Sequence, residues 1–197
     1  MSTALPAERP SRALRRPWLV SVSLGAAGTL VSLVLLTRPG SGQPWVALSN
    51  LIITALLGVW ITCSDIRTRL IPNAAIPTLA VLYSATSLAG VTYGWLSGAD
   101  ALRAAAAFAI VGVAYALLFI AGGTSPGDVK LAATLALAVG GFGWPAVIIG
   151  ALAPYLLALP EAVIRWASKA RQAGMPFGPY LVAGTLLALV GVLLQWW

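Results

Sequence analysis

Long apolar stretches, separated by short clusters of proline, glycine and charged residues, dominate this chain of 197 residues. Hydrophobic residues make up 59% of the chain and charged residues only 9%, whereas soluble domains carry roughly a quarter of charged residues. Side chains with so little polar surface cannot cover a water-soluble globule. The sequence therefore predicts a polytopic helical protein whose natural solvent is the lipid bilayer.

Seven apolar segments can be drawn along the chain, and we expect each of them to be a helix. They lie at about 18–36, 44–63, 74–96, 101–121, 127–140, 144–164 and 179–197. The fifth, at about 14 residues, is shorter than the ~17–25 residues of a typical span. We interpret residues 18–197 as a single transmembrane domain. Residues 1–17 form a basic tail before a first span that we expect to remain uncleaved.

The basic residues predict an orientation in the membrane. The net charge of +7 arises from twelve Lys and Arg against five acidic residues, and these charges fall in short loops, which favours membrane topology over nucleic-acid binding. With seven crossings and a cytoplasmic N-terminus, the tail and the loops after the second, fourth and sixth segments lie inside. They hold four, two, one and three basic residues, ten of the twelve. Without a crossing by the fifth segment, the basic cluster at 165–171 would lie outside.

Several classes of catalytic chemistry are excluded by residues that the chain lacks. It contains one cysteine, Cys63, and no histidine. An internal disulfide, a Cys/His zinc site and the His-dependent nucleophilic triads are therefore impossible. We expect no metal and no cofactor, and we expect Cys63 to be a buried structural thiol.

The acidic residues are few enough to consider one by one. They are Glu8, Asp65, Asp100, Asp128 and Glu161. Glu8 lies in the tail, Asp100 is interpreted as a solvated turn residue, and Glu161 precedes Arg165 by one helical turn, as in an ordinary ion pair. Asp65 and Asp128 each adjoin an apolar run at the same membrane face. An ionisable residue there is costly and is a functional hypothesis by default; the alternative is that each marks a helix end among basic neighbours.

The neighbours of these two residues favour the functional interpretation. Pro72 disfavours helix at the residue before it, and Asn73 is suited to the start of the next helix. Together they predict a sharp turn back into the membrane after Asp65. Gly127 permits close approach of another backbone to Asp128, so that a peptide substrate could lie against this carboxylate.

Two carboxylates brought to one water molecule can hydrolyse a peptide bond, because at close range they share a single proton. The ionised member takes a proton from water, while the protonated member donates to the scissile carbonyl. Asp65 ends one segment and Asp128 begins another. Helix dipoles therefore predict that Asp128 holds the charge and Asp65 the proton.

Three short motifs resemble those of the type IV prepilin peptidases, bacterial relatives of the Gly-x-Gly-Asp intramembrane aspartic proteases. The first is an Asp followed by Ile-Pro-Asn, present as Asp65 with Ile71, Pro72 and Asn73. The second is Gly-x-Gly-Asp-Val-Lys-Leu, present as Ser125-Pro126-Gly127-Asp128-Val129-Lys130-Leu131. The third is Pro176-Phe177-Gly178-Pro179. They occur in family order, and Ser125 in place of the first Gly is the one departure.

The resemblance implies a membrane aspartic endopeptidase with Asp65 and Asp128 as catalytic residues. It implies that the other motif residues shape the loops or line the substrate site. Its substrates would be prepilins or pseudopilins, cut at the cytoplasmic face of the inner (plasma) membrane. Longer family members carry an N-terminal Cys-x-x-Cys region associated with N-methylation. This chain resembles the short, peptidase-only members, and we do not expect it to methylate its product.

Two other classes of function stay open at this point. A proton- or cation-coupled transporter would use the two Asp as a relay, but it would need acids near the membrane midplane. A non-catalytic scaffold is suggested only by Ser125. The separation of the two carboxylates distinguishes these hypotheses from a peptidase.

Overall fold

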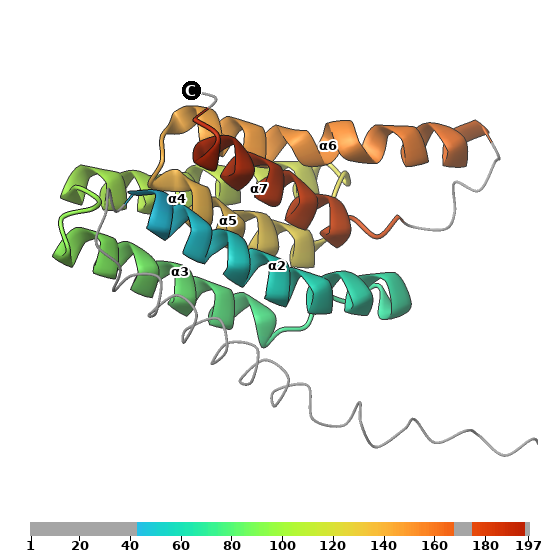
Figure 1. Ribbon diagram of the computed structural model, residues 1–197. Coiled ribbons are helices and arrows are strands. Elements are labelled where there is room, and N and C mark those ends of the chain that lie inside the picture. Colours follow the sequence, from blue (N-terminus) through green and yellow to red (C-terminus); the bar gives the residue numbers. More distant parts are fainter. Residues whose placement is uncertain (1–42, 168–174, 196–197) are drawn as a thin grey trace, which may run out of the picture.

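The computed structural model describes residues 43–167 and 175–195, and within them all regular secondary structure is helical (Figure 1). The helices are α2 (Gln43–Thr68), α3 (Ala75–Thr92), α4 (Gly98–Ile120), α5 (Pro126–Gly140), α6 (Trp144–Ala167) and α7 (Gly178–Leu193). They correspond to the second to seventh predicted segments. The predicted segment at 18–36 and the basic tail lie outside the described residues.

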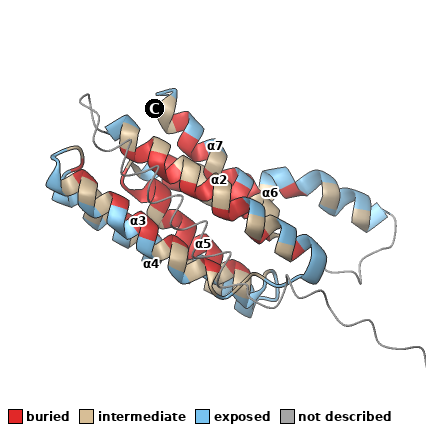
Figure 2. Ribbon diagram, turned by 60° about the horizontal axis from the view of Figure 1, so that its bottom comes forward, coloured by how far each residue is buried: buried red, intermediate tan, exposed pale blue. Residues whose placement is uncertain are grey.

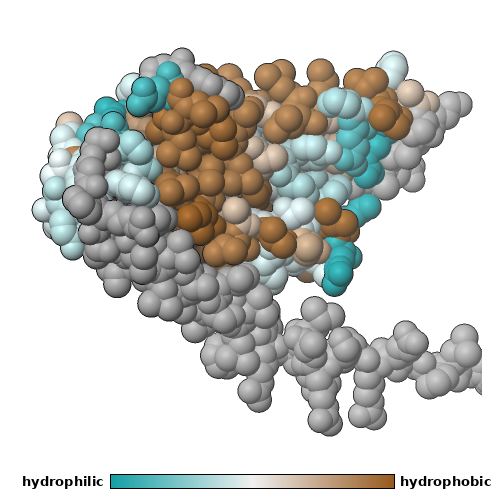
Figure 3. Space-filling model, viewed as in Figure 1, coloured by the Kyte–Doolittle hydropathy of each residue, from teal (hydrophilic) through white to brown (hydrophobic). Residues whose placement is uncertain are grey.

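Four of these helices, α2, α3, α4 and α6, are long and apolar enough to cross a bilayer. Exposed leucine, isoleucine, valine and phenylalanine side chains cover their outer faces. Figure 3 shows the apolar side chains as a band across the middle of the molecule, with hydrophilic residues toward both ends. Helices satisfy their own backbone hydrogen bonds, as lipid requires. The predicted all-helical architecture, with several helices suited to a membrane, is thus confirmed.

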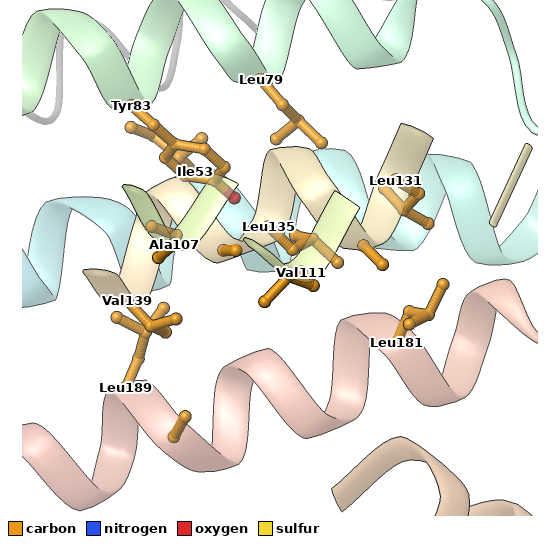
Figure 4. Packing of buried hydrophobic residues seen from close by; sticks show 14 of the residues in the cluster. Ile53, Leu79, Tyr83, Ala107, Val111, Leu131, Leu135, Val139, Leu181 and Leu189 are labelled. Carbon is orange, nitrogen blue, oxygen red and sulfur yellow. The ribbon is translucent and has the colours of Figure 1, made fainter. Parts of the chain in front are cut away.

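The short helix α5 forms the centre of the bundle. Ten of its fifteen residues are buried, and it contacts α2, α3, α4, α6 and α7. Figure 2 shows buried residues along α2 and α5, whereas the C-terminal part of α6 is largely exposed. In Figure 4, side chains of α3 and α7, including Tyr83 and Leu189, converge on Leu135 and Val139 of α5. Its neighbours therefore shield α5 from lipid.

Small residues allow this close packing, as is common between helices in membranes. A Cβ atom on Gly140 would lie 2.5 Å from the Ala104 Cα atom of α4. A Cβ atom on Gly184 of α7 would lie 2.5 Å from Cδ of Pro154 in α6. Both contacts are too short for a side chain, so glycine sets how closely these helix pairs approach.

Side chains from neighbouring helices bind the carbonyl groups at the C-terminus of α5. The Asn50 side chain of α2 donates to the Ala138 carbonyl at 2.9 Å. Arg103 of α4 donates to the carbonyls of Gly140 and Gly141 at 3.0 and 2.8 Å. The last carbonyls of a helix have no partner within it. These bonds therefore let α5 end inside the protein although, at about 22 Å, it is shorter than the ~30 Å hydrocarbon core.

Asp100 differs from its predicted role as a solvated turn residue. It lies in the first turn of α4, where it forms a reciprocal capping box with Ser97 and an ion pair with Arg103. The capping box satisfies free N–H groups at the start of the helix, and the ion pair orients the arginine toward the end of α5.

Asn50 is the centre of a buried polar network and should matter for stability. Besides its bond to Ala138, its side-chain oxygen accepts from Thr86 of α3 at 2.7 Å. Replacing Asn50 by Leu leaves the Ala138 carbonyl buried and unpaired. We expect the free energy of unfolding in detergent to fall by about 1–2 kcal/mol. Ser49→Ala is the control, because the buried Ser49 hydroxyl has no partner among the described residues. Equal stability of the two variants would contradict this role.

Candidate active site

Asp65 lies in the last turn of α2 and is only 5% exposed. The Gly178 N–H group donates a hydrogen bond to Asp65 Oδ2 at 2.9 Å. Because Gly178 is the first residue of α7, this carboxylate faces the N-terminus of that helix. A bond between residues so distant in sequence fixes the Asp65 side chain relative to the centre of the bundle.

The contact with α7 leaves no space for a side chain at Gly178. A Cβ atom built there would lie 2.8 Å from Asp65 Oδ2 and 3.3 Å from Asp65 Cγ. Glycine at this position thus lets the backbone N–H group reach the carboxylate. This contact joins the third motif, which contains Gly178, to the first motif, which begins with Asp65.

Asp128 lies in the first turn of α5 and is 6% exposed. The Ser125 N–H group donates to Asp128 Oδ2 at 3.0 Å, and the Asp128 N–H group donates to Ser125 Oγ at 3.2 Å. This is a capping box, which stabilises the start of a helix. Ser125 has φ −95° and ψ 157°, a conformation open to any residue. The departure from the family's Gly therefore introduces no strain and adds a helix cap.

The two carboxylates come together at one end of the bundle, close enough for the Asp128 charge to act on Asp65. Each has Oδ2 bound by a backbone N–H group, and Oδ1 of each accepts no hydrogen bond from the described residues. The buried bundle interior around them lowers the effective dielectric, which strengthens this repulsion. Such a pair favours sharing one proton.

The helix-dipole argument for unequal roles changes once α7 is considered. Asp65 does end α2, and Asp128 does begin α5, as predicted. However, the N-terminus of α7 also faces Asp65, and the Arg69 charge acts on it as well. Both features favour an ionised Asp65. Burial of Asp65 acts in the opposite direction, because it disfavours the charged form. The assignment of the proton to Asp65 stays a prediction.

The segment after Asp65 packs against the segment before Asp128. The Ile71 Cδ1 atom lies 3.4 Å from the position that a Cβ atom would take on Gly127. The Pro72 carbonyl accepts a hydrogen bond from Ala75 N–H at 2.9 Å, closing the turn that leads into α3. Asn73 does not cap α3 as predicted. It is exposed, and the residue before the helix, Ala74, forms no side-chain cap, because the backbone bond to Pro72 already supports the helix start.

An open pocket of about 540 Å³ adjoins Asp128. Its walls come from the loop before α5, from α6 and from the segment before α7. The lining residues are Gly122, Gly123, Thr124, Ser125, Asp128, Tyr155, Ala158, Leu159, Ala162, Met175 and Phe177. The wall is mostly apolar or small, with a carboxylate on one side, which suits a peptide segment with small side chains.

A model of the type IV leader peptidase family matches residues 51–163, which is more than half of the chain and includes both Asp65 and Asp128. This chain belongs to the type IV leader peptidase family. No curated protein and no solved structure matches it significantly. Family membership confirms the resemblance inferred from the motifs and indicates that the chain is a peptidase.

The remaining motif residues of this peptidase have different placements. Phe177 packs against Tyr155 of α6 with the two rings tilted and their centroids 5.1 Å apart. Pro179 lies in the first turn of α7, preceded by the half-buried Pro176. Lys130 is exposed and lines a separate cavity between α3, α4 and α5. The structure therefore brings the third motif to the two Asp, but not the Lys130 side chain.

Cys63 and Glu161 lie outside the motifs, and the structure corrects the prediction for the first and extends that for the second. Cys63 is exposed rather than buried, since it lies on the outer face of α2. Glu161 pairs with Arg165 as expected, and its carboxylate also accepts a hydrogen bond from the Tyr180 hydroxyl of α7. That bond ties α6 to α7 near the pocket.

No motif or pattern in the sequence indicates the α6 residues that line the pocket. Tyr155 lies in a long apolar segment whose other residues face both lipid and protein, so no periodic pattern distinguishes it. The packing of α6 against α5 and α7 brings Tyr155 and Asp128 to the same pocket.

Proposed function

We propose that this chain is an aspartic endopeptidase in which Asp65 and Asp128 form the catalytic pair. The observation that carries the proposal is the meeting of two buried, electrostatically interacting carboxylates from distant segments, one of which, Asp128, lines an open pocket. Each carboxylate has one oxygen fixed by a backbone N–H group. The other oxygen is available for water or for the peptide.

In the proposed reaction the pair holds one proton and a water molecule. The ionised carboxylate removes a proton from water as the water oxygen attacks the scissile carbonyl carbon. The protonated carboxylate donates its proton to the carbonyl oxygen. The tetrahedral intermediate then collapses. Its C–N bond breaks, and the leaving nitrogen takes a proton from the carboxylate pair. A hydroxyl group of the intermediate returns one proton to the carboxylate pair as the new carboxyl group forms.

The proposed substrate is a prepilin or pseudopilin preprotein anchored in the membrane. By the family resemblance it has a short basic leader, a Gly before the cut and an apolar helix after it. The small and apolar lining of the pocket supports this proposal, because a Gly-containing segment fits against Gly122, Gly123 and Ala158. No finding supports the transporter hypothesis.

We also propose that the chain crosses the inner membrane seven times, with the N-terminus and the Asp pair at the cytoplasmic face. A reporter placed after Trp197 should then be outside the cytoplasm, and one placed in the loop at 166–174 should be inside. Ten of the twelve basic residues lie inside in this arrangement. An outside signal from the 166–174 reporter would reject the crossing by the fifth segment.

The activity can be tested by co-expression with a fusion that carries a basic leader ending in Gly and an apolar helix of about 20 residues. We expect a shorter product that lacks the leader, detected by its mobility and its new N-terminal sequence. A second fusion carries Ala-Ala-Ala in place of the leader's basic residues. Comparing its cleavage with that of the intact fusion separates recognition of the basic leader from the cleavage reaction. Absence of product from the intact fusion would count against the proposal.

A further inference from the structure

Unpaired hydroxyl groups gather at the pocket. Within the described residues, three buried side-chain oxygens have no hydrogen-bond partner: Ser49 Oγ, Thr124 Oγ1 and Tyr155 OH. Two of the three belong to residues that line the pocket beside Asp128. Buried polar groups are nearly always paired, and an exception calls for an explanation, such as a catalytic role or a bound molecule that supplies the bond. Their shared location points to a ligand that supplies the bonds.

Two neighbouring tyrosines of the pocket region differ in the hydrogen bonds of their hydroxyl groups. The rings of Tyr115 and Tyr155 lie 5.8 Å apart. The Tyr115 hydroxyl donates to the Ala151 carbonyl at 3.0 Å, whereas the Tyr155 hydroxyl meets hydrogen-bond geometry with none of the described residues. The Asp128 charge acts on Tyr155, and Phe177 packs on its ring. The Tyr155 hydroxyl lies close enough to the Tyr115 hydroxyl for the two to interact, but this contact does not meet hydrogen-bond geometry.

Thr124 occupies the loop that forms another wall of the same pocket. It directly precedes Ser125, whose own hydroxyl already accepts from Asp128 N–H. The remaining lining residues, apart from Asp128, carry glycine, apolar or aromatic hydrocarbon surface. Tyr155 and Thr124 thus supply the uncommitted hydrogen-bonding side chains on either side of Asp128.

We propose that the hydroxyl groups of Tyr155 and Thr124 bind the peptide backbone of the preprotein next to the bond that is cut. The Tyr155 hydroxyl donates to a substrate carbonyl oxygen, and the Thr124 hydroxyl pairs with a neighbouring backbone group. A hydroxyl can donate or accept, and a peptide backbone offers both kinds of partner. Both oxygens are shielded from solvent in the free protein, so each side chain has to rotate toward the pocket to meet a peptide seated there. This inference rests on the proposed function.

The test compares Tyr155→Phe and Thr124→Val with the wild-type protein in detergent, using the leader–helix fusion as substrate. Each variant loses only a hydroxyl or exchanges it for a methyl group. We expect kcat/KM to fall about 3- to 10-fold for each, the effect of one neutral hydrogen bond. We expect the Tm to be unchanged or higher, because an unpaired buried hydroxyl has been removed. Thr124→Ser, which keeps the hydroxyl, should retain the wild-type kcat/KM.

Two controls separate this role from a structural one. Ser49→Ala removes the third unpaired hydroxyl, which lies about 24 Å from Asp65 along α2, and should leave kcat/KM unchanged. Tyr115→Phe should lower the Tm, because the Ala151 carbonyl loses its partner, and so gives the change in Tm expected from loss of a structural hydroxyl. A wild-type kcat/KM in Tyr155→Phe, or a loss of kcat/KM accompanied by a matching fall in Tm, would overturn this inference but not the proposed function. A wild-type protein that leaves the fusion uncut would reject the proposed function as well.

Discussion

Replacing either Asp65 or Asp128 by Asn should abolish cleavage of the preprotein, with a loss of at least about 1000-fold in kcat. Asn retains the shape of the side chain and can still accept from the Gly178 or Ser125 N–H group. It cannot share a proton with the remaining carboxylate, so water is no longer activated. The measurement is the rate of product formation by purified variants, with membrane insertion and Tm recorded in parallel.

The chain contains a matched control for the Asp128 variant. Asp100 occupies the same position in the capping box of α4 that Asp128 occupies in that of α5. Asp100→Asn removes the same charge from the same kind of helix start, and it weakens the ion pair with Arg103. It should lower stability and leave the activity of the folded protein intact. Cleavage at the wild-type rate by Asp65→Asn or Asp128→Asn would reject the catalytic pair.

Gly178→Ala should reduce kcat about 100-fold without preventing folding. The added Cβ atom would lie 2.8 Å from Asp65 Oδ2, and the carboxylate, at the end of a short side chain, is the group that moves. A displacement of about 1 Å from a productive geometry can cost about 100-fold in rate. The measurement is kcat with the fusion substrate, together with the Tm of the variant.

Gly150→Ala provides the comparison for this substitution. Gly150 is also a helical glycine, but its added Cβ atom would meet Val139 Cγ2 at 3.5 Å, an ordinary contact. We expect it to retain both activity and stability. If Gly178→Ala were as active as Gly150→Ala, the α7 contact would not position Asp65.

Local sequence patterns predicted the helices well, because each begins and ends at signals that act within a few residues. Proline and glycine clusters separate the apolar segments, and the predicted ranges for α2 to α7 differ from the observed helices by a few residues at their ends. The cap of α5 was also readable, since Ser125 followed three residues later by Asp128 is a capping-box pattern. The residue that departs from the family motif is therefore also the residue that caps α5.

The contacts between helices could not be predicted in this way. That the N-terminus of α7 faces Asp65 depends on how α7 packs against α2, and neither segment carries a pattern that specifies its partner. The placement of Tyr155 beside Asp128 depends in the same way on α6 packing against α5 and α7. For Asn73 the sequence suggested a side-chain cap, but a backbone turn from Pro72 took its place. Sequence thus located the two carboxylates, and tertiary packing determines which groups surround them.

The fixed far end of α5 makes this helix a spacer of defined length for Asp128. Asn50 and Arg103 hold its last carbonyls, so the number of residues from Asp128 to Gly140 determines both the depth and the direction of the carboxylate. One inserted residue would turn Asp128 by about 100° and shift it by about 1.5 Å, away from Asp65. Related chains are therefore free to vary the apolar side chains in this stretch, whereas insertions and deletions should be confined to the loops on either side of it.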